Sequence, residues 1–87
     1  MSEKYSLQFG KLIPARREVV VTVPRELAEV FRDQLNRAEL GVETVISFTP
    51  GGSDATVVKM SIHDKDQERF RKFFDDFQQG KRIRLRS

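Results

Sequence analysis

The sequence has no cysteine among its 87 residues. Disulfides and thiolate metal sites, the usual supports of small secreted domains, are therefore excluded. No apolar run approaches the ~20 residues that a membrane helix needs. The N-terminus, Met1 to Tyr5, is charged and lacks the apolar segment of a signal peptide. We expect a soluble cytoplasmic protein that has no membrane partner.

Histidine is nearly absent as well, since His63 is the only one. A catalytic triad would have to recruit this residue, and nothing near it in the sequence marks a nucleophile. His63, Asp64 and Asp66 could approach a metal ion, but their position favours the end of a strand followed by a helix cap. Asp75 and Asp76 diverge by about 100° on a helix and do not form a shared acid–base site. We therefore expect no enzyme, no catalytic residue, no metal site and no cofactor.

Positive charge is in modest excess, and its placement is uneven. Residues 1–63 contain eight basic and eight acidic side chains, whereas residues 64–87 contain eight basic and five acidic ones. The net charge of +3 therefore arises in the last quarter of the chain, chiefly in Lys81 to Arg86. An excess of this size is a weak indication of an anionic partner.

Residues 64–79 contain four of the seven phenylalanines. Phe70, Phe73, Phe74 and Phe77 recur at helical spacing, so one face of a helix carries all four rings. Burying one such ring contributes about 1.5–3 kcal/mol, so this helix should organise the core. Asp64 and Gln67 have the spacing of a capping box, and Gly80 suits the helix end.

The rest of the pattern predicts a single α+β domain over residues 18–87, preceded by an arm over residues 1–17. Strands are expected at residues 18–23, 42–49, 55–63 and 82–86, with a first helix at residues 25–40. Pro50 to Asp54 supplies the turn of a hairpin. The order βαββαβ predicts a ferredoxin-like, four-stranded antiparallel sheet with both helices on one face. Tyr5, Leu7 and Phe9 alternate with polar residues, so the arm could add an edge strand.

Each predicted strand has one apolar face for the helices. These faces are formed by Val19, Val21 and Val23; Ile46 and Phe48; Val58, Met60 and Ile62; and Ile83 and Leu85. The opposite face should carry Val20, Thr22, Val45, Ser47, Val57, Lys59, Ser61 and the arginines of residues 82–86.

A sheet face with apolar spots favours a non-enzymatic binding or regulatory module. Its partner would be a protein, with a second copy of the chain included, and it would bind through the open face and the basic C-terminal strand. The predicted partner-binding residues are Val20, Thr22, Val45, Val57, Lys59 and Ser61.

Nucleic-acid binding is the alternative. The RNA-recognition motif shares this element order but stacks bases on aromatic side chains of its central strands. The corresponding residues 19–23 and 55–63 contain no Phe, Tyr or Trp. Contacts to backbone phosphates need only charge and reach. They would use Arg16, Arg17, Lys59, Lys81, Arg82, Arg84 and Arg86.

A second alternative is a small-ligand regulatory domain like the ACT domains, which have this topology. In those domains the loop from the first strand to the first helix usually contains glycine. Here that loop, Thr22 to Glu26, has none.

Overall fold

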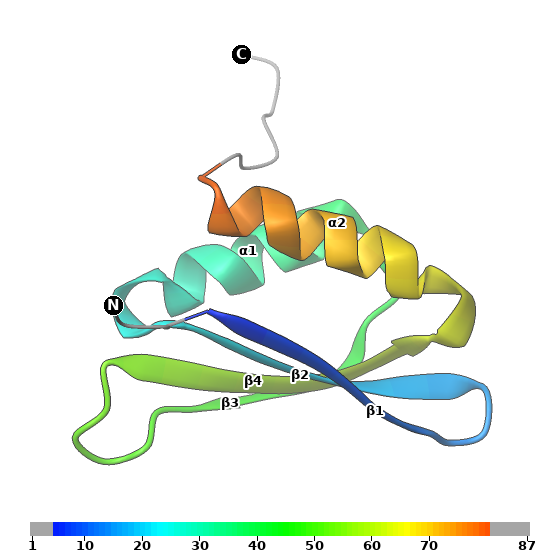
Figure 1. The fold of residues 1–87 in the computed structure, drawn as a ribbon, viewed down its shortest axis with the longest axis horizontal. Helices are drawn as coiled ribbons and strands as arrows, with labels where there is room; N and C mark the ends of the chain where they lie inside the picture. The colour runs from blue at the N-terminus through cyan, green and yellow to red at the C-terminus, as the bar shows by residue number, and fades with distance from the viewer. Residues whose placement is uncertain (1–4, 81–87) are drawn as a thin grey trace.

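The fold comes from a computed structural model, which describes residues 5–80. Its strands are β1 (Ser6–Leu12), β2 (Arg16–Pro24), β3 (Glu43–Phe48) and β4 (Ala55–His63). Helix α1 (Ala28–Ala38) follows a short 3-10 turn (Arg25–Leu27), and helix α2 (Gln67–Gln78) follows a second one (Asp64–Asp66). Both helices lie on the same side of the sheet (Figure 1).

The strands form one antiparallel sheet in the order β1-β2-β4-β3. This is an α+β fold, and its order is consistent with the predicted ferredoxin-like arrangement. The N-terminal strand is present as β1, and it occupies the edge beside β2, where that arrangement would place the final strand. The predicted strand at residues 82–86 lies outside the described residues.

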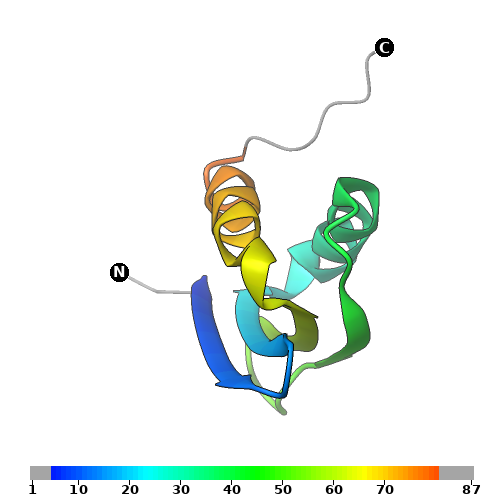
Figure 2. The ribbon, with the colours of Figure 1, turned by 90° about the vertical axis from the view of Figure 1, so that its right-hand side faces the viewer.

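The core is a layer of side chains between the sheet and the helices. Val19, Val21 and Val23 of β2 are fully buried, as are Val58 and Ile62 of β4. The four phenylalanines of α2 are also buried, as predicted, and Figure 2 shows the helices side by side above the curved sheet. On α1, a helix that the sequence also predicted, Phe31 and Leu35 are the buried members.

Phe31 joins the two helices. Its ring centroid lies 5.1 Å from that of Phe77 and 5.6 Å from that of Phe73. Strand β1 adds to the same cluster, because Phe9 meets Phe70 edge to face at 6.4 Å and Tyr5 meets Phe74 at 6.3 Å. Aromatic pairs in this geometry contribute about 0.5–1.5 kcal/mol beyond their buried area.

The start of α2 differs from the predicted capping box. The Asp64 side chain caps no backbone N–H, and its carboxylate accepts hydrogen bonds from Gln67 and Arg17 at 2.9 Å each. The backbone N–H of Asp64 donates to the carbonyl of Ala15. These bonds join the beginning of α2 to β2 and to the β1–β2 turn. The predicted end is correct, because Gly80 follows the helix with a φ of 81°.

We expect Phe31→Ala to lower the free energy of unfolding by about 3–5 kcal/mol, because a buried ring leaves a cavity that neighbouring rings cannot fill. Urea denaturation measures this loss. Leu12→Ala is the matched control, since Leu12 is 46% exposed, and its effect should stay below about 1 kcal/mol. Equal losses for the two variants would contradict the central role of Phe31.

Candidate functional site: the open sheet face

The open face is the side of the sheet that no described helix covers. On β2 and β4 it is formed by the residues that alternate with the buried valines. Its members are Arg16, Glu18, Val20 and Thr22 of β2, Ala55, Val57, Lys59, Ser61 and His63 of β4, and Glu43, Ile46 and Phe48 of β3. The structure therefore places Val20, Thr22, Val57, Lys59 and Ser61 together on this face, as the alternation predicted.

The prediction for β3 was wrong. Val45 packs against the core cluster, whereas Ile46 and Phe48 are 55% and 47% exposed. The cause is the pairing with β4, in which Ile46 lies opposite Lys59 and Phe48 lies opposite Val57. Side chains of paired residues share a face of the sheet, so Ile46 and Phe48 belong to the open face.

A β-bulge in β3 sets this phase. Glu43 pairs with Ser61 and Ile46 with Lys59, so Thr44 and Val45 together oppose the single residue between those two partners. Thr44 has a φ of 56°, in the left-handed region that a β-branched residue rarely adopts. The extra residue keeps Glu43 on the open face while turning Val45 toward the core.

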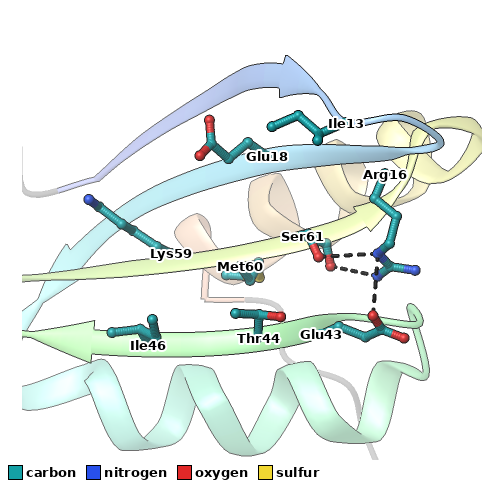
Figure 3. Close-up of a pocket in the computed structure, with 9 residues that line it drawn as sticks. All are labelled: Ile13, Arg16, Glu18, Glu43, Thr44, Ile46, Lys59, Met60 and Ser61. Carbon is teal, nitrogen blue, oxygen red and sulfur yellow. Dashed lines mark hydrogen bonds and ion pairs between the residues drawn. The ribbon is translucent and has the colours of Figure 1, made fainter.

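Arg16 connects three parts of the open face. Its Nε donates to Ser61 Oγ at 3.1 Å, and its Nη2 donates to the carbonyls of Ser61 at 2.8 Å and Gly41 at 2.6 Å. The guanidinium also forms an ion pair with Glu43 at 3.6 Å. Figure 3 shows the side chain extending from β2 across to β3. Arg16 thus ties the start of the bulged segment, at Gly41 and Glu43, to β2 and β4.

Beside Arg16 the face is hollowed, with a volume of about 390 Å³. The lining residues are Ile13, Arg16, Glu18, Glu43, Thr44, Ile46, Lys59, Met60 and Ser61 (Figure 3). Ile13 comes from the β1–β2 turn and is 58% exposed. Exposed apolar groups therefore border the face on two sides, at Ile13 and along β3.

The charges that β2, β3 and β4 contribute to this face cancel. Arg16 and Lys59 are the cations of these three strands on the face, and Glu18 and Glu43 are the anions. Arg16 and Glu43 already pair with each other. Lys59 Nζ lies 5.9 Å from the centroid of the Phe48 ring, a cation–π arrangement.

The arginines predicted for phosphate binding are engaged within the chain as far as they are described. Arg17 forms an ion pair with Asp64 at 2.8 Å and donates from Nη1 to the carbonyl of Gly10. Arg16 is occupied as described above. Lys81, Arg82, Arg84 and Arg86 lie outside the described residues, so their part in that alternative stays a prediction.

Sequence reasoning missed Glu18, Glu43, Ile13, Ile46 and Phe48 as members of this surface. The alternation that identified Val20 also places Glu18, so that signal was present. Alternation groups Ile46 with Phe48, but it does not show which face of the sheet the pair occupies, because the bulge sets the phase of the strand. Ile13 follows the last residue of β1, where the alternation ends.

Two further features, a metal-binding cluster and a membrane-spanning helix, are absent from residues 5–80. No group of three or more histidine and acidic side chains there could hold a metal ion. Within the same range, no helix combines the length and the apolar character needed to span a membrane. Comparison of the chain with protein-family models, with curated proteins and with solved structures gives no match.

We expect Thr44→Gly to raise the free energy of unfolding by about 1 kcal/mol, since glycine adopts a left-handed conformation without the steric cost of a Cβ. Chemical denaturation measures the change. Thr44→Ala is the matched control: it removes the branch but keeps the Cβ, so it should relieve less of the strain. A destabilised glycine variant would show that the threonine side chain supports the bulge.

Proposed function

We propose that this protein is a non-enzymatic binding module that contacts a protein partner through the open sheet face. The observation that supports it is the exposure of Ile13, Ile46 and Phe48, each about half accessible, around a face on which the charges of β2, β3 and β4 cancel. Exposed large apolar side chains grouped on one surface are typical of protein interaction sites. A cytoplasmic location belongs to the same proposal, because the chain has no cysteine.

Charge balance favours a protein over a nucleic acid as the partner. Binding to phosphates requires a surplus of unpaired cations, and it weakens steeply as salt displaces the contacts. On this face Arg16 is paired with Glu43, and the carboxylate of Glu18, on the neighbouring strand, offsets the charge of Lys59, whose ammonium lies over the Phe48 ring. A contribution from residues 82–86 remains a prediction.

Ile46→Glu should abolish retention of the partner, because a carboxylate placed among the apolar side chains cannot be desolvated cheaply. The full chain is immobilised and exposed to extract of its native cells, with and without nuclease. Leu12→Glu is the matched control, because Leu12 is about as exposed as Phe48 but lies on the opposite face of the sheet. Leu12 pairs with Arg17, and Arg17 pairs with the buried Ile62, so all three belong to the helix-covered face. The Leu12→Glu variant should retain the partner.

Protein retention should also persist as salt is raised, because apolar burial is not screened by ions. Loss of all retained material after nuclease treatment would overturn the proposal in favour of nucleic acid. So would equal retention by the wild type and Ile46→Glu, since the open face would then have no part in binding.

A further inference from the structure

Four side chains of the open face lie on one diagonal of the sheet, in the order Phe48, Lys59, Glu18, Ile13. Phe48 pairs with Val57, which lies one strand inward and two residues before Lys59. Glu18 pairs with Ser61, two residues beyond Lys59. Each step therefore crosses one strand and advances two residues.

The last step follows the same rule. The backbone N–H of Ile13 donates to the carbonyl of Arg16 at 2.7 Å, which places Ile13 beside Arg16, two residues from Glu18. Ile13 and Glu18 line the same hollow, as Figure 3 shows. At the other end, the contact between Lys59 and the Phe48 ring confirms that these two side chains are neighbours.

The diagonal reads apolar, cation, anion, apolar, and this order is complementary to itself when reversed. A two-fold axis in the plane of the face, perpendicular to the diagonal at its midpoint, exchanges Lys59 with Glu18 and Phe48 with Ile13. We propose that the partner of the open face is a second copy of this chain, bound about this axis. Each Lys59 then meets Glu18 of the second copy, and each Phe48 meets Ile13 of the second copy.

Two independent features agree on one axis. Any pair of opposite charges can be matched by some two-fold operation, so Glu18 and Lys59 alone would not identify the partner. The axis that matches them also superposes the exposed apolar ends of the diagonal, on β3 and on the β1–β2 turn. This is the self-complementarity that a symmetric interface between identical subunits requires.

This inference rests on the proposed function, since it names the partner of the same face. Glu18→Lys and Lys59→Glu should each weaken self-association about a hundredfold, because each replaces the two opposite-charge contacts across the axis by like-charge pairs. Mixing the two variants should restore a dimer, since both contacts then join a lysine to a glutamate. The double variant Glu18→Lys/Lys59→Glu should associate alone.

Sedimentation equilibrium of the full chain reads the result as a mass of 10.1 kDa or twice that value. Glu29→Lys on α1 and Lys65→Glu before α2 are matched controls, because both positions are exposed and away from the open face. These two variants should remain dimeric. A wild type that stays monomeric, or single variants that associate like the wild type, would overturn the inference.

The position of the axis gives a second readout. On sheet spacings of about 4.8 Å between strands and about 3.4 Å per residue, Val20 lies roughly 1–2 Å from the axis and Thr22 roughly 7 Å from it. Since the chain has no cysteine, Val20→Cys should be joined to its own copy by a short bis-maleimide reagent. Thr22→Cys, on the same strand and face, should react far less. The reverse preference would exclude this axis.

The two proposals fail in different ways. If the chain is monomeric and Ile46→Glu still abolishes protein retention, the partner is a different protein and only the present inference fails. If neither association nor retention depends on the open face, both fail.

Discussion

The contact between Phe31 and the phenylalanines of α2 is the interaction on which the rest of the structure depends. It holds the two helices against each other, and both then cover the valines of β2 and β4. Because the apolar face of α2 is used entirely on this side, no described helix remains for the other side of the sheet. The open face is thus a consequence of how the core is filled: two helices, each apolar on one side only, can cover one face of a four-stranded layer.

The bulge in β3 turns this uncovered face into a surface with defined chemistry. In a regular strand with Glu43 on the open face, Val45 would lie on the open face as well, and Ile46 and Phe48 would point toward the core. The extra residue at Thr44 shifts the alternation after Glu43. The charged Glu43 and the apolar Ile46 and Phe48 therefore share the open face. The local strain of a left-handed threonine accompanies this arrangement. Arg16 holds the segment in place through Ser61, Gly41 and Glu43.

Periodicity was sufficient for most of the fold. Val19, Val21 and Val23, and Val58, Met60 and Ile62, all point where strict alternation placed them. The same reasoning failed at β3, because Ile46 and Phe48 are more apolar than Val45 and Ser47, and preference for the stronger hydrophobes gave the wrong face. A bulge leaves no mark in composition when threonine, not glycine, takes the left-handed position. The edge strand was ambiguous for another reason: Leu7 with Phe9 and Ile83 with Leu85 are equivalent patterns, and alternation cannot choose between them.

The place of β1 in the sheet has a consequence for how the chain folds. The edge beside β2 is completed through a turn of a few residues, so this pairing closes a short loop and loses little chain entropy. In the ferredoxin-like arrangement, where the final strand fills that edge, the edge pairing could form only after nearly the whole chain had been synthesised. All four described strands instead precede α2 in the chain, so the layer can assemble during synthesis before its second cover is made. Until α2 is made, α1 alone covers the valines of β2 and β4, and transiently exposed apolar surface of this kind is prone to aggregation.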